Sequence, residues 1–370
     1  MTSETKRLFM CQSAARFRRG MARVVAGLAL TTLCGAQTIA GFLPNPIRTV
    51  STIPPNGDVN PNGVVFVPKD FPGTTLAAGD LLVTDFNNNQ NLQGLGTTVL
   101  HVPQSGSPSV FYTADSTHTG LSGALGTMHA GFVLVGSFPT YDGTCATAQA
   151  GSILILNSAG QLDATIAGEL VDGPWGMAVY DEGYKAHAFV TNALNGTVTR
   201  FDLAVTKGAI GLTDAVTVAS GYRFSCDPAS LVDAPAGLVY EPKTDTLYVA
   251  STLDDAVYAL TGAGSATSSL GTGTVIYQDS THLHGALQLA LTPTGHLLVT
   301  NNDVINSNVG EPSEIVEFTT AGQFVKQIPV DPNLGGSFGV QTSNLGNNVS
   351  QLAAVDDNAV TLTIWTIPTH

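Results

Sequence analysis

One two-part pattern recurs through this 370-residue chain and constrains its fold more than any single motif does. In each copy a Gly or another small residue opens an apolar stretch, and a second apolar stretch follows that ends in a small polar or acidic residue. The clearest copies are 173–180 with 188–192 and 234–242 with 247–251. Six copies align, at intervals of roughly 50 to 63 residues, and this spacing is typical of repeats that each form one propeller blade. The aligned positions are Gly63, Gly126, Gly176, Gly237, Gln288 and Gly339.

Most copies continue into a third apolar segment that is bounded by Gly, Pro, Asn and Asp, which is the pattern of short strands joined by turns. No stretch after the first 36 residues shows a convincing helical period. The chain is therefore predicted to be all-β, a six-bladed β-propeller. Because the last copy ends soon after its third strand, the strand-like segment 47–53 is expected to supply the fourth strand of the last blade and to close the ring.

The first 36 residues have the organisation of a secretory signal peptide. Basic residues fill 1–23, an apolar run covers 24–33, and Cys34-Gly35-Ala36 precedes the expected cleavage site. An uncleaved anchor over 24–43 is the alternative. The predicted organisation is thus a signal peptide at 1–36, a segment with the closing strand at 37–57, and a propeller at 58–370, in a secreted protein that is extracellular or periplasmic.

Net charge narrows the choice of partners. Removing residues 1–36 leaves eight Lys and Arg against 27 Asp and Glu, a formal net charge of −19. Such a surface repels phosphate backbones and anionic lipids, so neither nucleic acid nor insertion of the mature chain into a membrane is expected. A monomer that binds a small molecule or a protein is the expectation.

Two cysteines, Cys145 and Cys226, remain beyond the signal peptide. An even pair in an exported protein indicates a disulfide. Cys145 falls between the second and third strands of the second repeat, and Cys226 falls between the third repeat and the fourth. These two classes of loop emerge on the same face of a propeller, so the bridge is geometrically possible. Two free thiols are the alternative.

Small polar residues that follow the second strand of each repeat are the candidate site. We expect them to point toward the axis at one mouth of the ring, where carboxylate and amide oxygens suit a hard cation such as Ca²⁺. The alternative is that Asn and Asp end strands because they form turns. The candidates are Asp85, Ser137, Asn192, Ser251, Asn301 and Asp356.

The candidates have different expected roles. Asn62, Asp85, Asn301 and Asp356 are the predicted metal ligands, and Asp85 is also the predicted catalytic base. Predicted ligand-binding residues are Asn192, Ser251, Trp175 and His284, with packing between blades as the alternative for Trp175. His284 with His282 lacks an evident third zinc ligand. The sequence contains no Gly-x-Ser-x-Gly, His-Glu-x-x-His or phosphate-binding loop.

Two segment pairs, 61–68 with 81–85 and 235–242 with 246–251, resemble the NHL-repeat and SMP-30/gluconolactonase-like group of six-bladed propellers, and the resemblance covers about 58–366. It implies a divalent ion on the axis, held by a Glu, two Asn and an Asp that also serves as the base in lactone hydrolysis. Asn62 and Asp85 match two of these residue types. Ala236 and Ser251 stand where an Asn and an Asp are expected, and Asn60 or Asn62 replaces the Glu.

Three functions follow from these observations. The first is a secreted propeller that binds a small ligand, cation or protein at its acidic, Asn-rich mouth. The second is a metal-dependent, lactonase-like hydrolase, or a lyase, with Asp85 as the base. The third is a scaffold for protein interaction. Fold alone does not choose among them.

Overall fold

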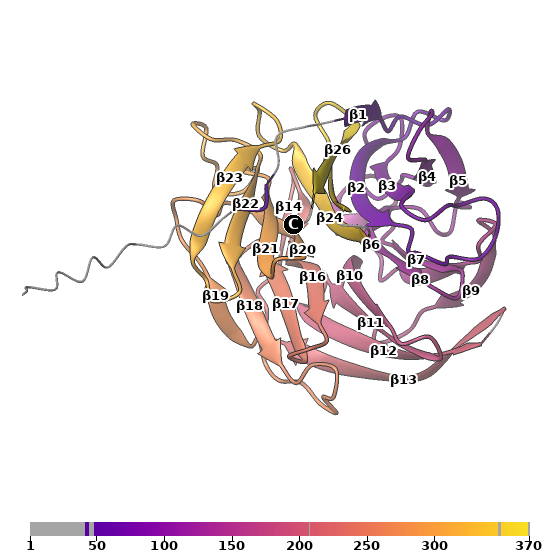
Figure 1. Ribbon diagram of the computed structural model, residues 1–370. Coiled ribbons are helices and arrows are strands. Elements are labelled where there is room, and N and C mark those ends of the chain that lie inside the picture. Colours follow the sequence, from indigo (N-terminus) through magenta and orange to yellow (C-terminus); the bar gives the residue numbers. More distant parts are fainter. Residues whose placement is uncertain (1–40, 44–47, 207, 347–348, 369–370) are drawn as a thin grey trace, which may run out of the picture. The chain divides into compact units, whose positions relative to one another are not determined.

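The computed structural model describes residues 41–43, 48–206, 208–346 and 349–368. Six four-stranded antiparallel sheets are arranged around a common centre (Figure 1). The predicted all-β, six-bladed propeller is therefore confirmed. Residues 1–36, predicted to be a signal peptide, lie outside the described residues. No helix among the described residues is long and apolar enough to cross a membrane.

Each blade is a meander whose strands pair in chain order. Blade 1 consists of β2 (Val59–Phe66), β3 (Leu81–Asn87), β4 (Thr98–Val102) and β5 (Ser109–Thr113). Blade 2 consists of β6 (Leu121–Met128), β7 (Phe132–Ser137), β8 (Ser152–Leu156) and β9 (Leu162–Ile166). Blade 3 consists of β10 (Pro174–Asp181), β11 (Lys185–Asn192), β12 (Thr197–Thr206) and β13 (Ala209–Ser220).

The second half of the ring repeats this plan. Blade 4 consists of β16 (Pro235–Glu241), β17 (Thr246–Ser251), β18 (Ala256–Thr261) and β19 (Thr274–Tyr277). Blade 5 consists of β20 (Ala286–Leu291), β21 (His296–Asn301), β22 (Glu314–Thr319) and β23 (Phe324–Pro329). Blade 6 consists of β24 (Ser337–Gly346), β25 (Val349–Asp356), β26 (Thr361–Pro368) and β1 (Arg48–Ser51).

The ring closes as predicted, through a strand from the start of the propeller. β1 pairs antiparallel with β26, and Arg48 lies opposite Ile364. In Figure 1 the indigo β1 accordingly lies beside the yellow β26. Apolar side chains then join the two ends of the chain, because Val64 and Val83 of blade 1 share a core cluster with Val355 and Leu362 of blade 6.

The innermost strand of every blade carries a β-bulge at the same place, where its pairing with the second strand is interrupted. The small residue of the repeat lies in this bulge because neighbouring inner strands nearly touch there. A Cβ on Gly176 would lie 2.1 Å from the Ala236 carbonyl oxygen, and a Cβ on Gly237 would lie 2.5 Å from Cα of Gln288. In five blades the aligned small or polar residue occupies this position.

In blade 2 the aligned glycine of the sequence repeat does not lie in the bulge. Its bulge runs between Leu121 and Leu125, one residue longer than the others. Gly126 pairs regularly with Leu134 and lies beyond the bulge, so the position equivalent to Gly176 falls at Gly123 or Ala124. The extra residue displaces the bulge relative to the aligned glycine. The spacing of glycines in the sequence could not reveal this displacement.

Two connections depart from the simple meander. A short hairpin of β14 (Ser225–Asp227) and β15 (Leu231–Asp233) links blades 3 and 4. The 3₁₀ turn η1 (Cys145–Thr147) lies between the second and third strands of blade 2. A disulfide joins Cys145 to Cys226 with 5.7 Å between their Cα atoms. The predicted bridge between these two loops is confirmed.

The segment before the propeller packs at the seam between blades 5 and 6. Phe42 and Leu43 are buried with Trp365 and Leu352. Their backbone N–H groups donate to the carboxylate of Glu317, at 2.8 to 3.2 Å, and His296 Nδ1 lies 2.6 Å from the same carboxylate. Glu317 is fully buried, and its charge is satisfied by these donors.

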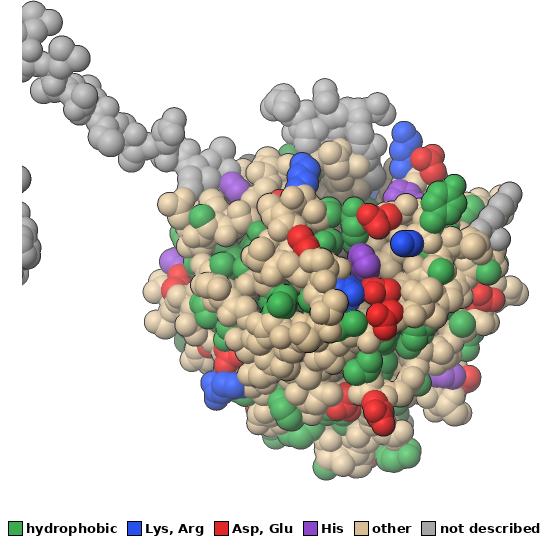
Figure 2. Space-filling model, turned by 90° about the horizontal axis from the view of Figure 1, so that it is seen from below, with side chains coloured by type: hydrophobic (Ala, Val, Ile, Leu, Met, Phe, Trp, Pro, Cys, Tyr) green, Lys and Arg blue, Asp and Glu red, His purple; other side chains and the backbone are tan. Residues whose placement is uncertain are grey.

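The kinds of side chain on the surface agree with the amino-acid composition of the sequence. Figure 2 shows a face dominated by uncharged polar side chains and backbone, on which apolar, acidic and basic side chains are scattered singly or in small groups. Scattered apolar side chains are normal on a soluble protein, so this face offers no large apolar patch that would mark a partner.

Candidate functional site at the channel mouth

The candidate site is a cavity of about 260 Å³ at the end of the central channel where the inner strands begin. Its floor consists of bulge residues from the inner strands, because a bulge re-aims a side chain that would otherwise pack between blades. The floor residues are Asn62, Trp175, Leu287 and Phe338. Three of the four are apolar, so one side of a bound molecule would meet a hydrophobic surface.

Trp175 is held in the floor by aromatic packing. Its ring meets Phe86 and Phe138 edge to face, with ring centroids 5.0 and 5.7 Å away, and its side chain is 3 % exposed. Trp175 thus combines the two roles considered from the sequence, because it lines the cavity and also packs between blades.

The wall on the side of blades 1, 5 and 6 carries several amide side chains and one carboxylate, and the apolar side chains of Val304, Ile305 and Leu334 also line it. Asn87 donates from Nδ2 to Asn91 Oδ1 at 2.8 Å, while its own Oδ1 is buried without a donor among the described residues. Asp357 provides the carboxylate. The amide side chains of the wall are Asn60, Asn87, Asn91, Gln93, Asn302 and Asn358.

The β14–β15 hairpin forms part of the rim. Ala229, Ser230 and Val232 line the cavity, and the Gln93 side chain reaches across from blade 1 to donate to the Ala229 carbonyl at 3.1 Å. The disulfide through Cys226 fixes the other side of the hairpin to blade 2. The rim is thereby fixed at two points outside its own strands.

Asp85 lies behind the polar wall. It lies in β3 opposite Pro61, its side chain is fully buried, and both of its carboxylate oxygens lack a hydrogen-bond donor among the described residues. Burial raises the pKa of Asp85 well above its usual value, and the nearby charges of Asp58 and Asp357 raise it further. An enclosed carboxylate of this kind is stabilised by a proton or a cation.

The other two carboxylates near Asp85 differ in their surroundings. Asp58 Oδ2 accepts hydrogen bonds from the Thr97 backbone N–H and from the hydroxyls of Thr97 and Thr98, all within 2.9 Å. Asp357 lines the cavity, and burial together with the charge of Asp356 raises its pKa to about 6. A ligand in the cavity would therefore meet Asp357 rather than Asp85.

The strand-end residues of blades 3 and 4 do not line the cavity. Asn192 accepts the Asp172 backbone N–H and donates to the Thr197 and Thr199 hydroxyls. Ser251 donates to Asp254 at 2.8 Å. Both side chains close loops within their own blades, which is the turn-forming role given as the alternative. Their assignment as ligand-binding residues remains a prediction without a geometric basis here.

In blade 5, Asn301 and His284 lie in a buried polar cluster beside the mouth. Asn301 Nδ2 donates to Glu314 Oε1 at 2.8 Å, and its Oδ1 accepts the His284 backbone N–H. His284 Nδ1 lies 2.7 Å from the Asn306 carbonyl oxygen, so Nδ1 carries the proton and donates it, whereas Nε2 is buried without a partner among the described residues. Neither Asn301 nor His284 lines the mouth cavity.

Glu314 is the most perturbed carboxyl of this cluster. Burial raises its pKa to about 8, and the neighbouring Asp303 charge adds to the effect, while the hydrogen bond from Asn301 opposes it. Its Oε2 is buried and has no partner in the described part of the chain. Glu314 follows a loop and begins a third strand, so the strand-end pattern could not single it out.

The four expected metal ligands do not form one set. Asn62 lies in the floor, Asp85 is enclosed behind the wall, Asn301 is bonded within blade 5, and Asp356 Oδ1 accepts the Ala359 backbone N–H at 3.2 Å. Among the described residues no group of three or more His, Cys, Asp and Glu could hold a metal. Only Asp85, with its two unpartnered oxygens, fits a cation, and any further ligands would have to be neutral oxygens.

Sequence reasoning missed two residues of the floor, Leu287 and Phe338. A signal for them is present in the repeat. The floor residues stand directly before the aligned small or polar residue, and two of the wall residues stand one position beyond the expected strand end. The bulge moves the site to these neighbouring positions.

Comparison with known proteins supports the fold alone. No protein-family model matches the sequence, and no curated protein matches it either. A putative oxidoreductase (glucose dehydrogenase) from Thermus thermophilus is 13 % identical with a TM-score of 0.53, and the alignment covers 87 % of this chain and all of that one. A luciferin-regenerating enzyme is 11 % identical with a TM-score of 0.51, covering 87 % and 95 % of the two chains.

A calcium-binding regucalcin from Agrobacterium tumefaciens is also similar, at 12 % identity and a TM-score of 0.49, with 85 % and 92 % of the two chains covered. Membership of the NHL-repeat family stays a prediction.

Proposed function

We propose that this propeller binds a small molecule in the channel mouth, and that the molecule carries an apolar face and an edge of hydroxyl or amine groups. The observation that carries this proposal is the presence, in one cavity, of a mostly apolar floor and a wall rich in amide side chains. Asn87 Oδ1 is a buried acceptor that receives no donor from any described residue. An unsatisfied buried polar group costs about 1–3 kcal/mol, which a ligand hydroxyl or amine would recover.

Charge favours a neutral or cationic ligand over an anion. Asp357 lines the cavity, and Asp58 and Asp85 lie behind it. An anionic ligand would be repelled by Asp357 and Asp58, whereas an amine would be attracted to Asp357.

A test of this proposal is ligand-induced thermal stabilisation with glucosamine, which has both hydroxyls and an amine, against glucuronate, which is anionic. We expect glucosamine to raise the melting temperature and Asn87→Ala to abolish the shift. Asn89→Ala in the same loop is the matched control, since Asn89 is exposed and lies outside the cavity. Equal shifts with glucuronate, or no loss in Asn87→Ala, would contradict the proposal.

Metal-assisted hydrolysis at the mouth is a second candidate, favoured by Asp357. A carboxylate whose pKa is about 6 is suited to act as a general base near neutral pH, and Asp357 is the one that lines the cavity. A divalent cation, if bound, would be held by Asp85 and would supply Lewis-acid polarisation of a carbonyl. This assignment moves the base from Asp85 to its accessible neighbour.

Lactone hydrolysis measured by proton release tests this candidate. We expect Asp357→Asn to lower kcat at least about a hundredfold, in the range of general-base catalysis. Asn89→Ala should retain full activity. If the wild-type protein releases no protons from γ- and δ-lactones with Ca²⁺, Mg²⁺, Mn²⁺ or Zn²⁺ present, the hydrolase candidate is excluded for these substrates.

A further inference from the structure

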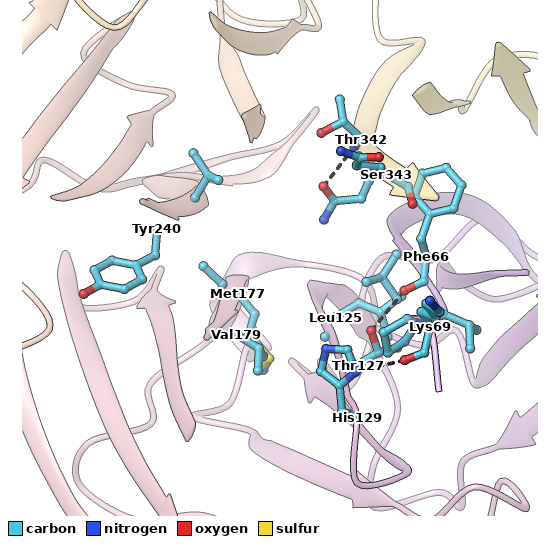
Figure 3. A pocket seen from close by; sticks show the side chains of 18 of the residues that line it. Phe66, Lys69, Leu125, Thr127, His129, Met177, Val179, Tyr240, Thr342 and Ser343 are labelled. Atoms are coloured by element: carbon cyan, nitrogen blue, oxygen red, sulfur yellow. Dashed lines mark hydrogen bonds between the residues drawn. The ribbon is translucent and has the colours of Figure 1, made fainter. Parts of the chain in front are cut away.

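The opposite end of the channel contains a second and larger cavity, of about 970 Å³, which we call the lower cavity. It is lined by the far ends of all six inner strands and shares no lining residue with the mouth. Figure 3 shows its side chains arranged around an open space, with Tyr240 on one side and Phe66, Lys69 and His129 on the other. A volume of this size lies within the range of small-molecule sites.

Gln288 separates the two cavities. Leu287 lines the mouth and Leu289 lines the lower cavity, and Gln288 lies between them on β20. Its Nε2 reaches to 2.3 Å from the position that a Cβ on Gly123 would occupy, in the blade across the ring. The channel is therefore crossed at its middle, and the lower cavity is a separate site rather than an extension of the mouth.

Apolar side chains from four blades form much of the wall of the lower cavity. They come from the far ends of the inner strands, where Val179 is partly exposed and the others are buried. The apolar residues used here are Leu125, Met177, Val179, Leu238 and Leu289. Such a surface inside a channel favours an apolar ligand body, at about 25 cal/mol for each Å² removed from water.

The charge of the lower cavity is opposite to that of the protein. The chain has 28 Asp and Glu, yet none lines this cavity, whereas Lys69 and His129 do. The two basic residues are coupled, since His129 Nδ1 donates to the Lys69 carbonyl oxygen at 3.0 Å. Lys69 forms no ion pair with another described residue. Asp181, which lies outside the lining, accepts the His129 backbone N–H.

Uncharged polar groups complete the wall. Thr342 and Ser343 of β24 lie across the open space from Met177 and Val179 (Figure 3). Inner strands are also the first strands of their sheets, so their channel edges carry backbone groups without a strand partner. These groups offer hydrogen bonds to an oxygen-bearing head group.

We propose that the lower cavity binds an amphipathic anion, in which a carboxylate or sulfonate head lies against Lys69 and His129 and an apolar body lies against Met177, Val179 and Leu238. This site is distinct from the mouth, whose acidic wall selects against anions. The two ends of one channel thus take ligands of opposite charge preference.

The experiment uses anilinonaphthalene sulfonate, an aromatic anion that fluoresces in apolar surroundings, and its displacement by decanoate. We expect saturable binding of one dye molecule and competition by decanoate but not by decanol. Lys69→Glu should weaken dye binding about tenfold, because it replaces an attraction with a repulsion of similar size. Lys185→Glu is the matched control, since Lys185 is exposed and lies outside the cavity.

A second pair of variants tests the apolar wall. Val179→Glu places a carboxylate where the ligand body would lie and should abolish dye binding, whereas Val275→Glu on exposed outer strand β19 should not. Melting temperatures of all variants show whether each one is folded. If Val179→Glu does not fold, Lys69→Glu still tests the proposal. Absence of saturable dye binding, equal competition by decanol, or equal effects of Lys69→Glu and Lys185→Glu would each overturn the proposal.

Discussion

The seam between blades 5 and 6 and the channel mouth both bury carboxylates, but they surround them differently. At the seam, Glu317 receives two backbone N–H groups from the N-terminal segment and a contact from His296. Beside the mouth, Asp85 receives no donor from a described residue, and one oxygen of Glu314 has no partner among the described residues. A buried carboxylate with donors holds the structure together, whereas one without donors is available to a proton or a ligand.

The largest predicted change in stability is that of a substitution at the seam. Glu317→Ala leaves the Phe42 and Leu43 amides buried without an acceptor, so it should lower the free energy of unfolding by about 3–4 kcal/mol. Urea unfolding of the wild type and variant measures this loss. Glu317→Gln, which keeps one carbonyl acceptor, should recover part of it. An effect below about 1 kcal/mol for Glu317→Ala would show that the donors at the seam do not matter.

Glu314, unlike Glu317, should destabilise the folded protein when its carboxyl group is ionised. Its pKa is about 8 when folded, above that of the unfolded chain, so the folded state keeps a proton that the unfolded state has released. The stability from Glu314 is therefore present below about pH 4 and is lost as the pH rises through 8. Glu314→Gln, which is neutral at every pH, should gain about 2–3 kcal/mol over the wild type at pH 8.5 and little at pH 4.5.

Urea unfolding at the two pH values measures that difference. Glu169→Gln is the control, since Glu169 is exposed and is not among the charges that raise the pKa of Glu314. A pH-independent difference between wild type and Glu314→Gln would mean that Glu314 is ionised in the folded protein, and the contrast between the two regions would fail.

Asp85 gives a smaller, ligand-dependent effect. If a cation satisfies its two free oxygens, Ca²⁺ at about ten to thirty times its dissociation constant should stabilise the wild type by about 1–2 kcal/mol. Asp85→Asn should remove this gain, as seen by thermal melting with Ca²⁺ and with EDTA. The same Ca²⁺ shift in Asp85→Asn and in the wild type would place the cation elsewhere.

The smallest effect is expected at the closing strand. The Thr49 and Thr363 hydroxyls are 3.0 Å apart on the exposed side of β1 and β26. Thr49→Val removes this hydrogen bond without burying an unpaired group, so the change should stay within about 0.5 kcal/mol in urea unfolding. A larger loss would mean that the closing strand depends on side chains as well as on its backbone pairing.

The sequence predicted the ring because the repeat carries the information that builds each blade. The segment 47–53 was recognisable as the closing strand since it was the one strand-like stretch available to complete blade 6. The bridge between Cys145 and Cys226 followed from the same plan, which sends both loops to one face. These features depend on strand order, and strand order is local in a propeller.

The site was harder to predict because it depends on one-residue shifts. Asp85 and Asn62 were identified as site residues, and both lie at or beside the mouth. Asn192 and Ser251 occupy equivalent strand ends, but they bond within their blades. Which strand-end residue closes a loop and which stays unpartnered depends on the neighbouring loop, and loops are the least regular part of the repeat.

The pairing of β1 with β26 also determines when the ring can be completed during protein synthesis. The hydroxyls of Thr49 and Thr363 meet although the two residues lie 314 positions apart in the chain. A ribosome must therefore have made the chain as far as β26 before the closing strand has a partner. Until then β1 remains an unpaired strand. The last blade is therefore where a newly made chain is most exposed to non-native pairing.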